Sequence, residues 1–295
     1  MLAFISLDTV GEEAGFPMRA AVLLDVDEVE LIEPNFERLT DDSFTQILLS
    51  MPAKEAKLLI STDEYPLAVA LNDGKGWKCA TFLLRKPVAD IFEMLEELDA
   101  EVLQEERVEW EAAVREYYSL RIAKEASPAL EDFTPTRALA VSDLLKERWK
   151  NVEGEICLDA CCGSGVGSVA LRDMGMVPLS FDNDPALLSL GLRTGRLVPE
   201  ETVCIDGTRA SRFLKHAHFG TMLMAGEIGP HNSIVWKKIT SEVLEVVDYV
   251  IVTVGTEREA RLVESWAKER KRKVEVLENK REAFYDNWVC DVRRM

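Results

Sequence analysis

The chain has 295 residues, of which 47% are hydrophobic and 7% aromatic, so its composition excludes a disordered or low-complexity protein and predicts two compact units. No apolar run approaches the roughly 20 residues that cross a bilayer, and the start of the chain lacks the basic segment of a secretion signal. We therefore expect a soluble, cytoplasmic protein that does not bind membranes.

The net charge of −18 is concentrated in the first half of the chain, where residues 1–150 hold 31 acidic and 16 basic side chains. A field of this sign repels phosphate backbones, so a nucleic acid is a less favoured partner than a small molecule or a protein. Solubility alone also explains such a charge. The one basic run that an RNA could use is Lys268–Lys273, and such a run is often a solvated helix end.

Residues 1–127 are predicted to form a small acidic α/β domain. Short runs of β-branched and aliphatic residues predict its strands, which are Met1–Val10, Arg19–Val26, Lys57–Ile60, Leu67–Leu71 and Trp77–Leu84. Asn72–Gly76 is rich in residues that tolerate positive φ and predicts a hairpin turn between the last two runs. From Pro87 to Lys124 apolar residues recur at three- and four-residue spacing, which predicts one long helix, with a break left open.

A second domain is predicted over residues 128–295, beginning with a helix over Arg137–Lys150. Glu155–Ala160 reads as a short buried strand that leads into the glycine-rich turn Cys161–Gly167 and then a helix through Arg172. Glycines there let a ligand approach the backbone, and the free N–H groups of the helix start can donate to it. Plain tight turns have the same pattern, so the turn alone does not establish a site.

Two further strands end in acidic turns. Val177–Phe181 ends in Asp182, roughly 20 residues beyond the glycines, the spacing at which an acidic residue binds ribose hydroxyls. Thr202–Ile205 ends in Asp206, at the same expected edge of the sheet. Helix N-capping explains either carboxylate alone, whereas the two together favour a ligand site.

These residues resemble the class I S-adenosylmethionine-dependent methyltransferases. Leu158–Gly167 is similar to the first motif of that family, Phe181–Pro185 to the second and Ile205–Gly207 to the third. The resemblance covers roughly residues 133–295 and implies an α/β, Rossmann-like, seven-stranded sheet with helices on both faces, preceded here by the smaller α/β domain with its long helix. It also implies S-adenosylmethionine as the cofactor.

The family pattern divides the cofactor among these motifs. It assigns Asp159 and the Cys161–Gly165 loop to the methionine part, Asp182 to the ribose hydroxyls and Asp206 to the adenine amino group. The cofactor-binding residues predicted in this way are Asp159, Ala160, Cys161, Cys162, Gly163, Gly165, Asp182, Asn183, Asp206 and Gly207. Thr134–Arg137 resembles the lead-in element of some nucleic-acid methyltransferases, which closes over the cofactor, although a helix start explains it equally well.

The remaining segments fit the same sheet. They are a helix at Ile239–Val247, a buried strand at Asp248–Val254, an amphipathic helix at Thr256–Arg270 and a terminal hairpin of Val274–Leu277 with Trp288–Val292. The six cysteines form no pair of CxxC units, which predicts reduced thiols and no metal site.

Residues 221–232 contain none of the family's signatures for transfer to an adenine amino group or to cytosine C5. By position, Glu227, His231 and Asn232 are the candidate catalytic groups, with Tyr285 or Asp286 from the terminal loop as further lining of the acceptor pocket. His231 and Asn232 also fit an ordinary turn after Gly229 and Pro230, and Tyr285 fits simple packing.

The sequence therefore predicts an S-adenosylmethionine-dependent methyltransferase that acts on a small molecule or a protein. Two alternatives stay open. The missing catalytic signature fits a non-catalytic S-adenosylmethionine-binding or partner protein. A dinucleotide oxidoreductase fits less well, because the acidic Asp159 would open the loop beside a pyrophosphate.

Overall fold

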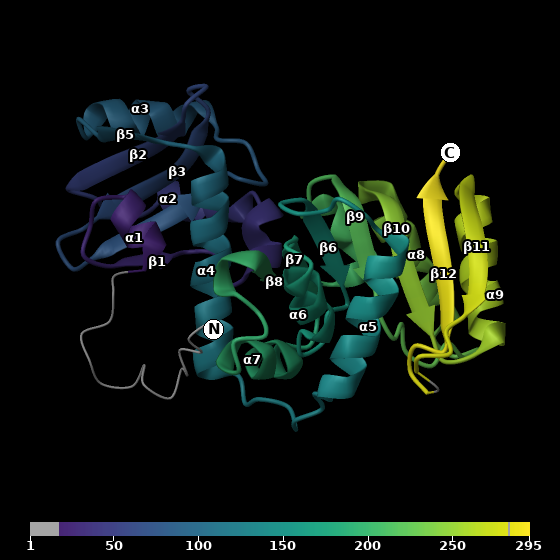
Figure 1. The fold of residues 1–295 in the computed structure, drawn as a ribbon. Coiled ribbons are helices and arrows are strands. Elements are labelled where there is room, and N and C mark those ends of the chain that lie inside the picture. The colour runs from purple at the N-terminus through teal and green to yellow at the C-terminus, as the bar shows by residue number, and fades with distance from the viewer. Residues whose placement is uncertain (1–17, 283) are drawn as a thin grey trace. The chain divides into compact units, whose positions relative to one another are not determined.

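A computed structural model of the chain describes residues 18–282 and 284–295 (Figure 1). These residues form two compact units, one ending at Leu120 and one running from Arg121 to Met295, so that the division falls inside helix α4 (Arg107–Glu125). The sequence places the boundary near Pro128, after this helix. No helix in the described part of the chain is both long and apolar enough to cross a membrane.

The N-terminal unit, up to Leu120, is built on a five-stranded mixed sheet. Its strand order is β1-β4-β3-β2-β5, in which β1 pairs with β4 and β5 with β2 in parallel, while the inner pairs are antiparallel. The strands are β1 (Val29–Leu31), β2 (Glu55–Ser61), β3 (Pro66–Asn72), β4 (Trp77–Thr81) and β5 (Glu101–Glu105). The helices are α1 (Arg19–Leu23), α2 (Ser43–Leu49), α3 (Ala89–Glu97) and α4, with a 3-10 helix at Phe36–Thr40. The hairpin predicted at Asn72–Gly76 is confirmed, because it joins β3 to β4.

One predicted element of this unit is wrong, one is broken in the way that the sequence left open, and a third lies outside the described residues. The strand expected at Arg19–Val26 is helix α1, since a short apolar run has no periodicity that separates a helix from a strand. The long helix expected over Pro87–Lys124 is interrupted by strand β5, which adds to the edge of the sheet after Asp99 turns the chain with φ of 48°. The strand predicted at Met1–Val10 is outside the described range.

The C-terminal unit, from Arg121, contains a seven-stranded sheet in the order β11-β12-β10-β9-β6-β7-β8. All neighbours are parallel except β12, which runs antiparallel to both β10 and β11. The strands are β6 (Ile156–Ala160), β7 (Val177–Asp182), β8 (Thr202–Cys204), β9 (Ala217–Met222), β10 (Val247–Val254), β11 (Arg272–Glu278) and β12 (Trp288–Arg294). The terminal hairpin predicted from the sequence is thus confirmed.

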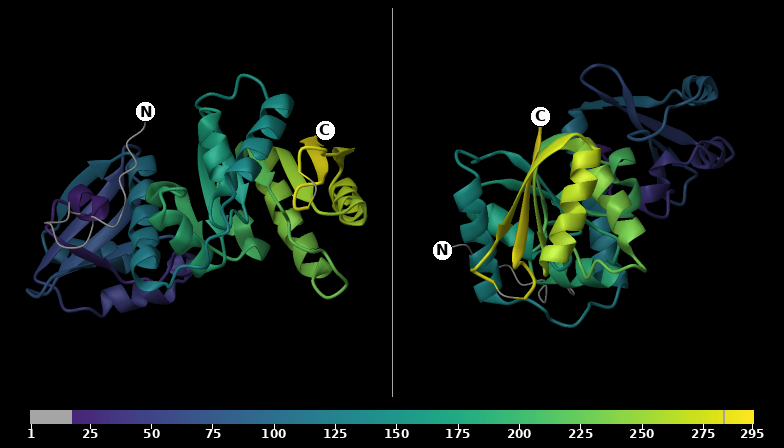
Figure 2. Two further views of the ribbon diagram at one scale, coloured as in Figure 1. Left: turned by 60° about the horizontal axis from the view of Figure 1, so that its bottom comes forward. Right: turned by 90° about the vertical axis from the view of Figure 1, so that its right-hand side faces the viewer.

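Helices cover both faces of this sheet (Figure 2). They are α5 (Pro135–Arg148), α6 (Val166–Asp173), α7 (Pro185–Arg193), α8 (Ser233–Val246) and α9 (Glu257–Glu269). Side chains of α5 and α6, among them Leu145 and Leu171, pack with Cys157 and Ile251 of the sheet in one buried cluster. The Rossmann-like fold expected for this part of the chain is therefore confirmed. Helix α8 begins six residues earlier than the predicted Ile239, which brings its first turns to the edge where the strands end.

Candidate functional site

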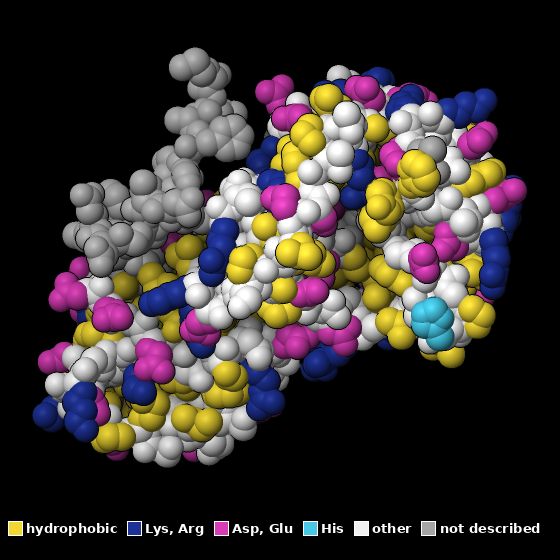
Figure 3. Space-filling model, turned by 90° about the horizontal axis from the view of Figure 1, so that it is seen from below, with side chains coloured by type: hydrophobic (Ala, Val, Ile, Leu, Met, Phe, Trp, Pro, Cys, Tyr) yellow, Lys and Arg dark blue, Asp and Glu magenta, His cyan; other side chains and the backbone are white. Residues whose placement is uncertain are grey.

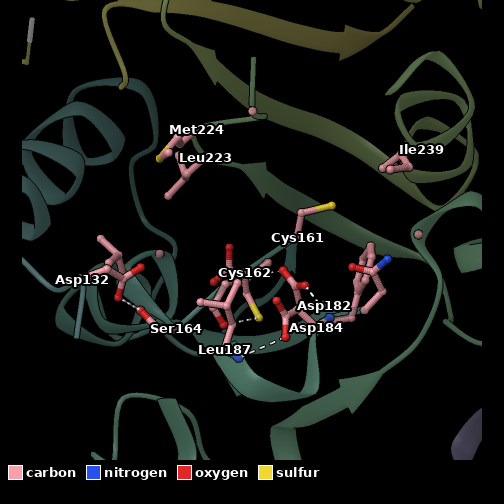
Figure 4. A pocket seen from close by; sticks show the side chains of 18 of the residues that line it. Asp132, Cys161, Cys162, Ser164, Asp182, Asp184, Leu187, Leu223, Met224 and Ile239 are labelled. Carbon is pink, nitrogen blue, oxygen red and sulfur yellow. Dashed lines mark hydrogen bonds between the residues drawn. The ribbon is translucent and has the colours of Figure 1, made fainter. Parts of the chain in front are cut away.

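The strand order places a crevice at the carboxyl edge of the C-terminal sheet. Strands β6, β7 and β8 follow one another outward, and the chain then returns to place β9 on the other side of β6. Ligands of open α/β sheets bind at such a reversal, beyond the carboxyl ends of the strands. A pocket of about 460 Å³ lies there, lined by residues that follow β6, β7, β8 and β9 (Figure 4).

The glycine-rich turn after β6 forms the floor of this pocket. Cys161, Gly163 and Gly165 have φ values of 54°, 54° and 92°, so the chain folds back sharply before α6 begins. At Gly167 a Cβ atom would lie 2.7 Å from Oδ1 of Asp159, which leaves room for glycine alone. The absence of a side chain at Gly167 therefore allows the carboxylate of Asp159 to lie directly against the start of α6.

Asp182 is the last residue of β7, and its buried carboxylate points to the glycine turn. It accepts hydrogen bonds from the backbone N–H of Gly163 and of Asp184, each at 2.9 Å. Burial raises the pKa of this carboxyl above its ordinary value, although these N–H donors oppose the shift. Asp184 caps α7 by accepting from the N–H of Ala186, so this second carboxylate has a structural role as well as a place in the pocket wall.

Asp159, the residue that the sequence assigned to the methionine part, touches the pocket but is only 1% exposed. Its two carboxylate oxygens accept hydrogen bonds from the hydroxyls of Ser168 at 2.7 Å and of Thr221 at 2.9 Å. Burial raises its pKa, because two hydroxyls compensate a buried negative charge only in part. Asp159 thus ties α6 and β9 to β6 beneath the turn.

The other predicted cofactor residues divide into two groups. Cys161, Cys162, Gly163, Asn183 and Gly207 line the pocket. Ala160, Gly165 and Asp206 do not belong to its lining: Gly165 is the N-cap residue of α6, and the carboxylate of Asp206 accepts from the N–H and the hydroxyl of Thr208 as the cap of a 3-10 helix.

The two adjacent thiols at the pocket are poor nucleophiles. Burial raises the pKa of both Cys161 and Cys162, and the nearby carboxylates of Asp182 and Asp159 raise it further. Both cysteines are therefore neutral thiols near pH 7. The described residues contain no group of three or more His, Cys, Asp or Glu side chains placed to hold a metal ion.

Sequence reasoning missed three charged residues of the pocket, Asp132, Arg137 and Asp184. Asp184 follows the predicted Asp182 closely, whereas Asp132 and Arg137 come from the segment that precedes β6. Asp132 accepts a hydrogen bond from the hydroxyl of Ser164 at 2.6 Å, and Arg137 donates from Nε to Asp286 at 2.8 Å. The similarity of Thr134–Arg137 to a lead-in element was the one signal in the sequence that pointed to this segment.

Two of the three predicted catalytic groups line a second, adjoining cleft of about 900 Å³, which shares Met224 and Gly226 with the first pocket. Glu227 and His231 line this cleft and are exposed. Asn232 is not part of the lining, because its side chain accepts from the N–H of Gly229 and donates to the carbonyl of Glu227. It stabilises the turn between β9 and α8.

The terminal loop supplies the other wall of this second cleft. Phe284 and Tyr285 line it and are 78% and 50% exposed, whereas Asp286 is buried and accepts from Thr253 Oγ1 at 2.5 Å. Asp286 is therefore not available to an acceptor, in contrast to its prediction as lining. Figure 3 shows the molecule from below the view of Figure 1, where hydrophobic side chains border a hollow in the surface.

Comparisons with known proteins find no matching family model and no matching curated protein. Among solved structures, the chain is similar to magnesium protoporphyrin IX methyltransferase from Synechocystis with bound S-adenosylmethionine, at 13% identity over 62% of this chain and 97% of that one, with a TM-score of 0.43. A TehB-like SAM-dependent methyltransferase from Corynebacterium glutamicum matches at 17% identity over 61% of this chain and 96% of that one, with a TM-score of 0.40. None of these likenesses identifies a reaction or a substrate for this chain.

Proposed function

We propose that the C-terminal unit binds S-adenosylmethionine and transfers its methyl group to an acceptor in the adjoining cleft. The observation that carries the proposal is the charge of the pocket. Of the described residues that line it, four are carboxylates, Asp132, Asp159, Asp182 and Asp184, and Arg137 is the one Lys or Arg. An excess of negative charge fits a ligand with a sulfonium and an ammonium group, and opposes the pyrophosphate of a dinucleotide.

The pocket also has the parts that an adenosyl ligand needs. Asp182 presents a carboxylate beside the glycine turn, where two ribose hydroxyls can donate to it. Phe181, Ile239 and Gly207 offer apolar contact for a flat base on the α8 side of the pocket. A volume of about 460 Å³ is within the usual range for small-ligand sites.

When bound, S-adenosylmethionine supplies a methyl group on a sulfonium sulfur. The nucleophile must approach that methyl carbon in line with the bond that breaks, and must lose a proton if it carries one. Glu227 and His231 line the adjoining cleft and are the groups proposed to accept that proton. We propose a small molecule or a protein as the acceptor in preference to RNA, in keeping with the net charge of −18.

Isothermal titration of the full chain with S-adenosylmethionine, S-adenosylhomocysteine and NAD tests the proposal. Asp182→Ala should weaken both adenosyl ligands about 10- to 100-fold, which is the size of a lost hydrogen bond to a charged group. Asp173→Ala removes an exposed carboxylate of the same unit and should leave binding unchanged. Absence of binding by the unmodified chain, or tighter binding of NAD, would reject the proposal.

A second measurement separates the enzyme from a non-catalytic binding protein. Radiolabelled S-adenosylmethionine is incubated with the chain and with small-molecule and protein fractions, and labelled product is counted. Binding that depends on Asp182, without transfer to any fraction, would favour the non-catalytic alternative.

A further inference from the structure

Arg137 is the one arginine among the described residues that line the acidic pocket, and its guanidinium group is only partly hydrogen-bonded within the described chain. Arg137 lies in the first turn of α5, and its side chain is 15% exposed. Nε donates to Oδ2 of Asp286 at 2.8 Å, and Nη2 lies 3.5 Å from Oδ1 of the same carboxylate. No described residue accepts a hydrogen bond from Nη1. One edge of the guanidinium is therefore held while the other remains available.

The partner of Arg137 is itself fixed in place. Asp286 is 1% exposed and accepts a second hydrogen bond from Thr253 Oγ1 at 2.5 Å. The ring of Tyr285 lies on the guanidinium, with its centroid 5.5 Å from the carbon of Arg137. A cation held in this way loses little conformational entropy when it binds a ligand.

Asp132 is presented to the same pocket five residues earlier in the chain. Its Oδ1 accepts from Ser164 in the glycine turn at 2.6 Å, so Oδ2 faces away from that bond. The neighbouring residues are anchored as well: Glu131 pairs with Arg196 at 2.9 Å, and the ring of Phe133 lies 4.9 Å from the guanidinium carbon of Arg196. The segment is thus fastened to the turn on which the ligand would lie.

Figure 4 shows where the labelled side chains lie along the pocket. Asp132 and Ser164 lie at one end, Asp182 and Asp184 lie further along, and Ile239 lies beyond them. If Asp182 binds the ribose, the end with Asp132 receives the other part of the ligand. The amino-acid part of S-adenosylmethionine carries one carboxylate and one ammonium group. The pocket offers one guanidinium, that of Arg137, and two exposed carboxylates, of which Asp184 caps α7 and Asp132 lies at this end.

We propose that Arg137 binds the α-carboxylate of the cofactor and that Asp132 binds its α-ammonium group. This inference depends on the proposed function, because it concerns the same pocket. It gives Asp159 a different part from the one implied by the family resemblance. Asp159 is 1% exposed and accepts from Ser168 and Thr221, so it positions the glycine turn and leaves the ammonium group to the exposed Asp132.

The test compares three adenosyl ligands. S-adenosylmethionine has both charged groups of the amino-acid part, decarboxylated S-adenosylmethionine keeps the sulfonium and lacks only the carboxylate, and 5′-methylthioadenosine lacks the whole amino-acid part together with the positive charge on sulfur. Titration of Arg137→Gln should weaken S-adenosylmethionine about 10- to 100-fold and change the decarboxylated ligand by less than about threefold. Asp132→Asn should weaken both of these ligands and leave 5′-methylthioadenosine unaffected.

The control is Arg209→Gln, which removes an arginine that lies over Phe213 in the same unit and outside the pocket. It should leave all three affinities unchanged. Equal weakening of the full and the decarboxylated ligand by Arg137→Gln would reduce Arg137 to a structural role and overturn the inference. If Arg137→Gln does not fold, Asp132→Asn and the ligand series on the unmodified chain still decide: equal affinity for all three ligands overturns the inference. Absence of all adenosyl binding would instead reject the proposed function.

Discussion

In the N-terminal unit a fully buried carboxylate, Glu33, lies against the guanidinium of Arg85, whereas the buried carboxylates of the C-terminal unit, Asp159 and Asp182, accept hydrogen bonds from hydroxyls and backbone N–H groups. The charge of Glu33 is compensated by the permanent positive charge of Arg85. Carboxylates compensated by neutral donors keep their negative charge and face a pocket. In the N-terminal unit the buried charges pair with each other within the fold, whereas in the C-terminal unit the buried carboxylates line a candidate binding site.

The buried pair of the N-terminal unit is embedded in further bonds. Arg85 donates to Thr45 Oγ1 and to the carbonyl of Leu39, both at 3.2 Å, and Glu33 accepts from the N–H of Thr81 at 3.2 Å. Burial raises the pKa of Glu33 even with Arg85 beside it. The pair thus stabilises the unit only as long as both partners are present.

The largest effect is expected from separating this pair. Arg85→Met alone leaves Glu33 buried without its counter-charge and should lower the free energy of unfolding by about 3–5 kcal/mol. The double variant Glu33→Leu, Arg85→Met should recover most of that loss, because two apolar side chains need no compensation. Urea denaturation of the full chain measures both, with hydrogen exchange to assign the transition to the N-terminal unit. An equal loss in the single and the double variant would contradict a charge-pair explanation.

A smaller effect is expected where the glycine turn meets Asp159. Gly167→Ala places a methyl group 2.7 Å from Oδ1 of Asp159 and 2.9 Å from Cδ1 of Leu223, so stability should fall by about 1–3 kcal/mol and cofactor affinity should fall with it. Gly220→Ala also crowds a buried position of the C-terminal sheet, 3.0 Å from Cγ1 of Val247, without contact to the glycine turn or to Asp159. Thermal unfolding and titration of both variants separate the two consequences. If Gly220→Ala lowers affinity as much at a comparable loss of stability, the loss reflects stability and not the geometry of the turn.

The sequence predicted most of the C-terminal fold because its strands are short buried runs that each end in a recognisable turn. Asp182 was predictable because its spacing from the glycines follows from one helix and one strand, α6 and β7. The wrong and the missed element lie where that information is weak: the wrongly predicted α1 is a five-residue helix, and the missed β5 is a partly exposed edge strand inside a helical pattern.

Two of the pocket residues that were missed depend on distant contacts. Arg137 and Asp286 are 149 positions apart, and Asp132 and Ser164 are 32 apart, so no local pattern joins them. The same reason explains the placement of the candidate catalytic groups. Position after β9 identified Glu227 and His231 as lining of a cleft, but only the folded turn shows that the side chain of Asn232 is engaged by Gly229 and Glu227.

The smallest effect is a dependence of cofactor affinity on pH. Burial raises the pKa of Asp182 above the 3.8 of an ordinary aspartate. As the pH falls through this raised pKa, the carboxylate of the free protein becomes protonated and loses an acceptor for the ribose hydroxyls. Affinity should therefore fall by at most about tenfold per pH unit below the pKa. The stability of the unliganded protein changes with pH in the opposite direction. Because the pKa of Asp182 is higher in the folded than in the unfolded state, ionisation of this carboxyl lowers the free energy of unfolding at higher pH. This loss shrinks as the pH falls through the folded pKa and disappears below the unfolded pKa.

Titration of S-adenosylmethionine at a series of pH values, on the unmodified chain and on Asp182→Asn, measures this dependence. The variant should bind more weakly at neutral pH and show a flatter profile, because its amide does not titrate. Glu33 also has a raised pKa, so Glu33→Gln should alter the dependence of stability on pH and leave that of binding unchanged. The explanation is wrong if the pH dependence of affinity becomes flatter in Glu33→Gln or stays unchanged in Asp182→Asn. Either result would mean that Asp182 is not the carboxylate whose protonation weakens cofactor binding.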